Sequence, residues 1–164
     1  MATSKVKSLS EMVQIRKQLR DQGKRLVFTN GCFDILHVGH VRYLNEARSM
    51  GDALAVGVNS DRSVGKNKGK GRPVVPGEER AEILAALGCV DYVFLFDQPT
   101  PQQVIDDLVP DVLVKGADWC LEEIVGRETV EKAGGVVKSI PFVEGASTTQ
   151  IIRKILQVFG NKVN

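Results

Sequence analysis

The chain is poor in the residue types that stabilise secreted proteins. Its 164 residues include only three cysteines, Cys32, Cys89 and Cys120, and none of them forms a CxxC pair. This count and spacing fit neither a disulfide framework nor a zinc cage, so we expect reduced thiols. No apolar run approaches the roughly 20 residues of a membrane span, and Met1 to Lys7 lacks the apolar stretch of a secretory signal. These absences indicate a soluble, cytoplasmic protein that does not bind membranes.

Net charge is also small. The 22 Lys and Arg residues against 20 Asp and Glu give a formal charge of +2 at pH 7. This near-balance argues against a protein whose whole surface binds nucleic acid or an anionic membrane. Five basic residues nonetheless lie between Arg62 and Arg72 with no acid among them, which leaves 17 basic against 20 acidic residues elsewhere. We therefore expect any anion binding to be local.

Hydrophobic periodicity divides the chain into alternating strands and helices. Apolar runs rich in β-formers predict strands at 25–30, 53–58, 92–96, 111–114 and 136–140. Helical spacing predicts helices at 39–50, 78–87, 101–108, 122–133 and 148–159, and an earlier helix that Ser10 caps and Gly23 ends. The alternation predicts an α/β fold: a Rossmann-like, doubly wound, parallel five-stranded sheet, expected order 3-2-1-4-5, with helices on both faces. We expect one domain at 25–164, preceded by a helical extension at 1–24.

One segment breaks this alternation. Residues 63–77 hold so much glycine, lysine and proline that we predict a long loop rather than a helix or a central strand. Loops of this length in compact α/β domains are usually functional or disordered. A basic run is most often a solvated surface, but a flexible basic loop beside an anionic site could instead close over it and neutralise charge.

Both histidines of the chain, His37 and His40, fall in one predicted strand-to-helix turn. That end of a parallel sheet faces the ligand crevice, and a helix N-terminus there favours an anion. Gly39 would let a phosphate approach the backbone, and two imidazoles could donate hydrogen bonds to phosphate oxygens in a transition state. The alternatives are ordinary surface histidines, or a metal site that uses the i, i+3 pair with Asp34.

The segment Asn30 to His40, NGCFDILHVGH, resembles the signature of the HxGH nucleotidyltransferase superfamily, the cytidylyltransferase-like adenylyl and cytidylyl transferases. The G-C-F-D before the histidines and the strand-before, helix-after context make the match specific. In that family the histidines stabilise the transition state as a substrate phosphate attacks the α-phosphorus of a nucleoside triphosphate and pyrophosphate leaves. The resemblance implies this role for His37 and His40, and it places Asp34 near the acceptor substrate.

The resemblance extends from about Leu26 to Leu156 and implies further site residues. Lys68 and Arg72, in K-G-x-G-R-P-V, match phosphate-contacting positions, and Arg80 matches one that helps to hold the acceptor phosphate. A helical ion pair with nearby acids is the alternative for Arg80. The predicted set is catalytic His37, His40 and Lys68; nucleotide-binding Asn30, Gly31, Cys32, Phe33, Gly39, Lys115, Gly116, Asp118, Ser147, Thr148 and Thr149; and acceptor-binding Asp34, Asn59, Arg72 and Arg80, with no protein ligand to a metal.

In two further motifs, one residue each has an alternative structural interpretation, Trp119 and Ser147. V-K-G-A-D after the fourth predicted strand matches a segment that lines the nucleotide pocket in the family's sugar-nucleotide members, and the adjacent Trp119 could be core or pocket wall. Ser147 is a suitable helix N-cap whatever the function. A helix N-terminus with free hydroxyls is also a phosphate cradle, and E-G-x-S-T-T resembles the family's triphosphate contact.

Within the family, the chain looks most like the adenylyltransferases of ADP-heptose synthesis, through G-V-N-S-D, P-D-x-L-V-K-G-A-D-W and S-T-T-x-I-I-R-K-I. The implied reaction transfers AMP from ATP to D-glycero-β-D-manno-heptose 1-phosphate for the lipopolysaccharide inner core. It implies Mg²⁺ held mainly by phosphates, a homodimer, a separate heptose kinase, and no covalent nucleophile. The alternatives are a cytidylyltransferase acting on glycerol 3-phosphate or a similar small phosphate, and a non-catalytic nucleotide-binding module.

Overall fold

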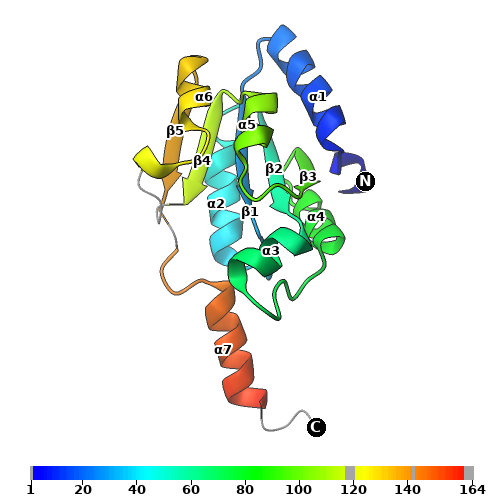
Figure 1. Cartoon of the computed structure of the whole chain (residues 1–164), viewed down its shortest axis with the longest axis vertical. Coiled ribbons are helices and arrows are strands. Elements are labelled where there is room, and N and C mark those ends of the chain that lie inside the picture. The colour runs from blue at the N-terminus through cyan, green and yellow to red at the C-terminus, as the bar shows by residue number, and fades with distance from the viewer. Residues whose placement is uncertain (1, 117–120, 142, 161–164) are drawn as a thin grey trace.

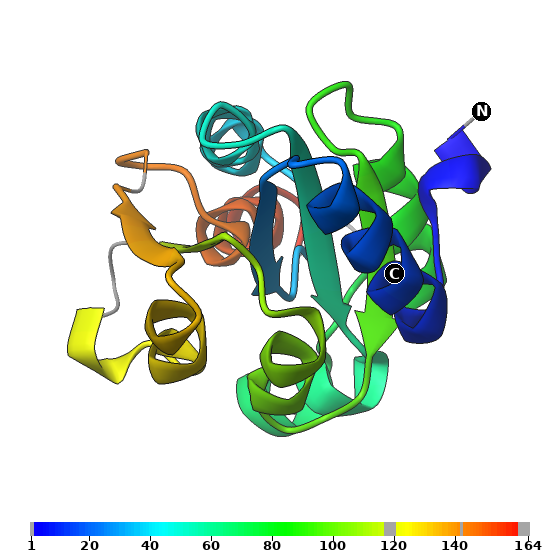
Figure 2. The same ribbon diagram turned by 90° about the horizontal axis from the view of Figure 1, so that it is seen from above.

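The computed structural model describes residues 2–116, 121–141 and 143–160, which form a sheet with helices on both faces (Figures 1 and 2). The strands are β1 (Leu26–Gly31), β2 (Ala53–Asn59), β3 (Tyr92–Phe96), β4 (Val112–Gly116) and β5 (Val136–Ile140). All pair in parallel, in the order β3-β2-β1-β4-β5. This confirms the predicted fold class and strand order.

Two hydrophobic clusters fill the space between the sheet and its helices. Helices α2 (Val38–Arg48) and α4 (Gly77–Ala85) contribute Leu44 and Leu84 to the cluster on one face. On the other face lie α1 (Leu9–Asp21), α5 (Gln102–Leu108) and α6 (Arg127–Lys132). Because both faces are covered, the strands can be almost continuously apolar, and β2 is buried along its whole length.

The N-terminal segment is part of this core. Met12 of α1 is fully buried in the second cluster, and the Lys7 amide donates a hydrogen bond to Val93 O at the sheet edge. The N-cap of α1 is Ser8 and not the predicted Ser10, because Ser8 and Glu11 form a capping box. A short 3-10 helix at Ala2–Lys5 precedes this helix.

Two further predictions are corrected. The first part of the predicted loop at 63–77 belongs to a helix, α3 (Asp61–Lys68). This helix forms because Ser60 caps its N-terminus and its own residues Ser63 and Val64 are buried against the rest of the molecule. The predicted helix at 122–133 is a 3-10 turn at Leu121–Glu123 followed by the shorter α6. Gly126 separates the two with φ +85°, a conformation that L side chains rarely adopt.

The last helix, α7 (Thr148–Phe159), matches the predicted bounds and projects away from the body of the molecule (Figure 1). None of its residues is buried. Over the described part of the chain, no helix is long and apolar enough to span a membrane.

Candidate active site

A cavity of about 900 Å³ opens at the carboxyl ends of the strands. It lies where the strand order reverses between β1 and β4, the usual position of a ligand crevice in such sheets. Segments distant in sequence meet there: the β1–α2 turn, α3, the end of β4 and the start of α7. Of the predicted site residues, its walls include Asn30, Gly31, Cys32, Phe33, Asp34, His37, Gly39, His40, Asn59, Lys68, Arg72, Lys115, Gly116, Ser147, Thr148 and Thr149.

His37 and His40 stack on each other in this cavity. Their ring centroids lie 3.9 Å apart with 29° between the ring planes. The Nδ1 atoms of both rings are buried and have no hydrogen-bond partner. Buried polar atoms are nearly always paired, so two orphaned nitrogens in one cavity indicate a ligand with hydrogen-bonding groups.

The local backbone explains this stacking. His37 is the N-cap of α2 and makes no side-chain capping bond, which leaves its ring free to turn over the helix end. A Cβ atom on Gly39 would lie 2.9 Å from His37 Nδ1 and 3.3 Å from the Ala146 Cβ atom. Only glycine therefore lets the His37 ring and the segment before α7 approach α2 this closely.

Both imidazoles are held in the neutral form. Burial, with a smaller contribution from the charge of neighbouring His37, lowers the pKa of His40 to about 4. Burial also lowers the pKa of His37. A neutral imidazole can donate one hydrogen bond, and a nearby negative charge favours its protonation. The pair can therefore respond to an anion that enters the cavity.

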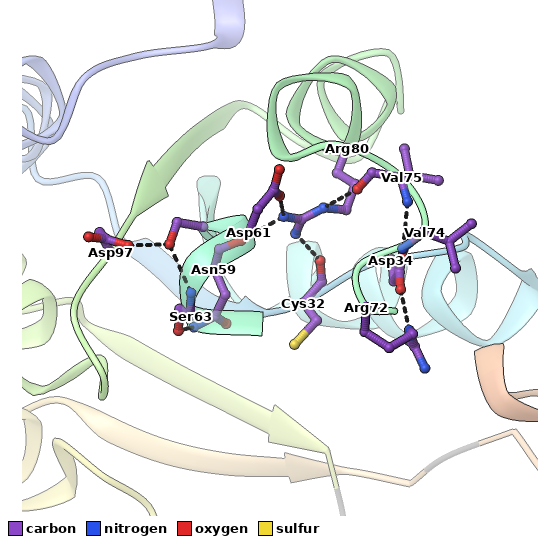
Figure 3. Close-up of polar contacts among 11 residues, drawn as sticks. Cys32, Asp34, Asn59, Asp61, Ser63, Arg72, Val74, Val75, Arg80 and Asp97 are labelled. Carbon is purple, nitrogen blue, oxygen red and sulfur yellow. Dashed lines mark hydrogen bonds and ion pairs between the residues drawn. The ribbon is translucent and has the colours of Figure 1, made fainter. Parts of the chain in front are cut away.

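Asp34 anchors the segment that follows α3. Its Oδ2 accepts from Arg72 Nε at 2.6 Å, and its Oδ1 accepts from the Val74 and Val75 amides at 2.8 and 3.0 Å (Figure 3). Burial acts to raise the pKa of this carboxyl, but the hydrogen bonds from Val75, Arg72 and Val74 keep it below its ordinary value. Asp34 is thus an ionised anchor that orients Arg72 at the cavity wall.

The predicted Lys68 stands at the C-terminal turn of α3 and also lines the cavity. Among its neighbours, Cys32 has a thiol whose pKa is raised by burial, although the charges of Lys68, Arg80 and Arg72 oppose this. A protonated thiol is a poor nucleophile, which fits the expectation that no covalent step uses Cys32.

Two other predicted groups meet at the cavity, one from each of the neighbouring strands β1 and β4. Lys115, at the end of β4, donates from Nζ to Asn30 Oδ1 at the end of β1. Ser147 caps α7 by accepting from the Gln150 amide, and Thr148 Oγ1 donates to Ile35 O at 3.1 Å. The start of α7 is thereby bound to the turn between β1 and α2. The predicted residues Asp118 and Trp119, like Cys120, lie outside the described residues.

Among the predicted site residues that the structure describes, Arg80 is the one that does not line the cavity. It is buried behind the wall, and its guanidinium donates to Val75 O, Cys32 O, Asn59 O and Asp61 Oδ1. The nearby-acid alternative is partly correct, since Asp61 pairs with it, but this carboxylate lies on α3 and not on its own helix.

Sequence reasoning missed one wall of the cavity. Residues 99–101, Pro-Thr-Pro, follow β3, and Asn67 of α3 and Tyr43 of α2 also line the space. The position of the Pro-Thr-Pro turn after a parallel strand was the available signal, because all such turns lie at one edge of the sheet. In the part of the chain that the structure describes, no group of three or more His, Cys, Asp or Glu side chains is arranged to hold a metal ion.

Comparison with known proteins gives relatives along nearly the whole chain. The bifunctional protein HldE of Geobacter sulfurreducens is 55% identical over 159 residues, which is 97% of this chain and 32% of that protein. HldE of Citrifermentans bemidjiense is 54% identical over 156 residues, 95% of this chain and 32% of its own. The chain therefore spans about a third of the length of these relatives.

Solved structures share the fold. The lipopolysaccharide core biosynthesis protein from Thermoplasma volcanium is 31% identical with a TM-score of 0.62, covering 76% of this chain and 100% of its own. A pantoate-β-alanine ligase from Francisella tularensis, solved with β,γ-ATP and β-alanine, has a TM-score of 0.57 at 14% identity and covers 94% of this chain and 78% of its own, which shows the fold alone.

A family model described as cytidylyltransferase-like matches residues 28–154, from β1 into α7. The matched range contains the stacked histidines, the start of the last helix and the basic segment, by which we mean residues 62–72. Together with the Thermoplasma protein, matched over its whole length, this confirms the family that the motifs predicted. The chain belongs to the cytidylyltransferase-like family of nucleotidyltransferases.

Proposed function

We propose that the chain transfers AMP from ATP to D-glycero-β-D-manno-heptose 1-phosphate and releases pyrophosphate. The observation that carries the proposal is the stacked pair His37 and His40, whose unpartnered nitrogens share a cavity with Lys68 and Arg72. This combination provides hydrogen bonds and positive charge in one place. A reaction in which negative charge accumulates on phosphorus needs both.

In this reaction, an oxygen of the acceptor phosphate forms a bond to the α-phosphorus of ATP. The bond from that phosphorus to the bridging oxygen of the β-phosphate breaks, and pyrophosphate leaves with the electron pair. The acceptor is already an ionised phosphate at neutral pH, so no side chain has to deprotonate it. Positioning and electrostatic stabilisation then account for catalysis.

We assign the residue roles that the family resemblance implied, and the placement of these residues in the cavity supports them. His37 and His40 donate hydrogen bonds to the α-phosphate as its charge rises. Lys68 stabilises the departing pyrophosphate, and the N-terminus of α7 with Thr148 and Thr149 binds the β- and γ-phosphates. Arg72, oriented by Asp34, meets the acceptor phosphate.

We expect Mg²⁺ to enter with ATP, bound by the phosphates. The described residues offer no cage for it, and Mg²⁺ commonly relies on substrate phosphates for much of its coordination. The ion would offset triphosphate charge, while the groups named above bind and orient the substrates.

The choice of acceptor rests on the motifs of the sequence and on the relatives. HldE is named as bifunctional, and the Thermoplasma protein is named for lipopolysaccharide core biosynthesis. We propose that a sugar kinase supplies the heptose phosphate. A cytidylyltransferase that uses glycerol 3-phosphate or a similar acceptor is the competing assignment.

We also propose that the chain is a homodimer that uses α7. Its apolar residues Ile155, Leu156 and Phe159 are all at least half exposed. Light scattering is expected to give twice the 17.9 kDa chain mass for the wild type and the mass of a single chain for Leu156→Glu. Gln157→Glu on the polar side is the control. A wild-type chain of monomer mass contradicts this proposal.

A product assay tests the function. Purified chain is incubated with Mg²⁺ and each pairing of ATP or CTP with heptose 1-phosphate or glycerol 3-phosphate, and products are identified by mass spectrometry. We expect ADP-heptose to be the main product. Product with CTP alone contradicts the adenylyl assignment, and nucleotide binding without pyrophosphate release in any pairing supports the non-catalytic module.

A further inference from the structure

Arg80 is the largest fully buried side chain in the described part of the structure. Every nitrogen of its guanidinium already meets a protein acceptor. Nε donates to Val75 O at 2.9 Å, Nη2 donates to Asn59 O at 2.8 Å and to Asp61 Oδ1 at 2.7 Å, and Nη1 donates to Cys32 O (Figure 3). A guanidinium engaged in this way has little capacity left for a substrate phosphate.

One of these acceptors belongs to the turn between β1 and α2, residues 32–37, which we call the catalytic turn. Cys32 O is the carbonyl just before Phe33, which has φ +47°, in the left-handed region that a bulky side chain rarely occupies. Such a conformation persists only where the surroundings hold it. Arg80 fixes the peptide before Phe33, and the hydrogen bonds to Asp34 fix the residue after it.

The Phe33 conformation determines what lies against the histidines. Its ring packs beside the His40 ring, with 5.3 Å between the centroids. The Phe33 ring also packs closely against Gly31, since a Cβ atom on Gly31 would lie 3.1 Å from this ring. A shift of the Cys32 peptide would therefore move the surface on which His40 rests.

Arg80 and Asp34 also hold Val75 from both sides. The Val75 amide donates to Asp34 Oδ1, and the Val75 carbonyl accepts from Arg80 Nε. Asp34 Oδ2 meanwhile pairs with Arg72 Nε at 2.6 Å. The same two charged side chains thus tie the segment that carries Arg72 to the turn that precedes the histidines.

We propose that Arg80 is a positioning residue, which holds the catalytic turn and the Arg72 segment in their reactive arrangement without contacting the acceptor. This positioning role replaces the acceptor-binding role that the family resemblance implied for Arg80. The kinetic test of this role rests on the proposed function, whereas a second test, by NMR of the histidine rings, does not.

The kinetic test compares Arg80→Lys with Arg16→Lys. Arg16 is a matched control, since it is also buried and donates to the carbonyls of Leu108 and Val109 on the approach to β4, at the other end of the sheet. We expect Arg80→Lys to lower kcat about 10²-fold, the scale of an ångström-sized misplacement, and to raise the acceptor KM by a smaller factor, because the displaced Arg72 also binds the acceptor less well. Arg16→Lys is expected to lower the melting temperature but to keep kcat.

Two kinetic results would overturn the proposal. A raised acceptor KM with unchanged kcat in Arg80→Lys would make Arg80 a substrate ligand. An equal loss of kcat in Arg16→Lys would make the effect a general consequence of destabilisation.

The second readout needs no turnover. His37 and His40 are the only histidines, so their ring signals can be followed by NMR in each variant. We expect Arg80→Lys to shift these signals and Arg16→Lys to leave them in place. If no donor and acceptor pair gives turnover in the wild type, the proposed function fails while this comparison still decides the role of Arg80.

A pair of variants at Asp61 covers the case in which Arg80→Lys does not fold. The Asp61 side chain is 53% exposed, so its replacement opens no core cavity. Asp61→Ala removes an acceptor from Arg80, whereas Asp61→Asn keeps one. We expect shifted histidine signals in the alanine variant and signals close to wild type in the asparagine variant. Wild-type signals in both Arg80→Lys and Asp61→Ala contradict the proposal.

Discussion

The rings of His37 and His40 lie face to face, 3.9 Å apart, with neither Nδ1 atom hydrogen-bonded. Because burial lowers the pKa of both, the two rings can stack without charge repulsion in the free protein. An incoming triphosphate supplies the negative charge that favours their protonation. The stacked pair is therefore stable in the free protein, and it binds an anion more strongly once the substrate favours protonation of the rings.

This arrangement predicts a pH-dependent stability. The pKa of His40 falls from 6.5 to about 4 on folding, so between these values the unfolded chain binds the additional proton. The His40 contribution to the free energy of unfolding is complete above pH 6.5 and is lost as pH falls towards 4. Urea titrations of wild type and His40→Gln at about pH 7 and about pH 4.5 measure it. The variant should lose less stability than wild type, and equal losses would contradict the assigned pKa.

The tight contact at Gly39 predicts a substitution that harms activity more than stability. Alanine favours helices by about 1 kcal/mol over glycine, but here its Cβ atom would displace the His37 ring. We expect Gly39→Ala to lower kcat at least about tenfold, because the stacked pair is misplaced. Gly65→Ala in α3 is the control, since its Cβ atom meets only Arg72 O, at 3.5 Å. Normal kcat in Gly39→Ala would show that the close packing has no catalytic role.

The basic segment predicts unequal effects from neighbouring lysines. Both side chains are exposed, but Lys68 lines the cavity and Lys70 does not. Loss of one charge-assisted phosphate contact costs about 1.5–3 kcal/mol, so Lys68→Ala should lower kcat/KM for ATP about 10- to 100-fold. Lys70→Ala should remain close to wild type. Equal effects of the two variants would mean that the segment acts only through its overall charge.

Much of the fold follows from local pattern. The strand at 92–96 and the helix at 148–159 have the predicted bounds, because apolar runs and a serine N-cap are strong local signals. α3 was missed because Gly65 and three basic residues obscure its pattern, while its stability comes from the Ser60 cap and the burial of Val64. Its helical character depends on packing that the local sequence does not express.

The candidate site also contains residues that a local motif predicts and contacts that it does not predict. The residues from Asn30 to His40 are contiguous, so their motif predicted the turn and its cavity. The contacts of Arg80 were not predictable in this way, because three of its four acceptors are backbone carbonyls from separate segments. Any residue type can supply a backbone carbonyl, so the sequence does not mark these positions. The Asp34 anchor likewise depends on the path of the chain after Arg72.

In the proposed reaction the two histidines stabilise the transition state of adenylyl transfer, and pyrophosphate release by wild type and His40→Ala tests this role most directly. Both proteins are assayed with ATP, Mg²⁺ and heptose 1-phosphate after circular dichroism has confirmed that they fold alike. We predict steady pyrophosphate release by the wild type and a rate at least about 10²-fold lower for His40→Ala. An equal rate in the two proteins would contradict the account.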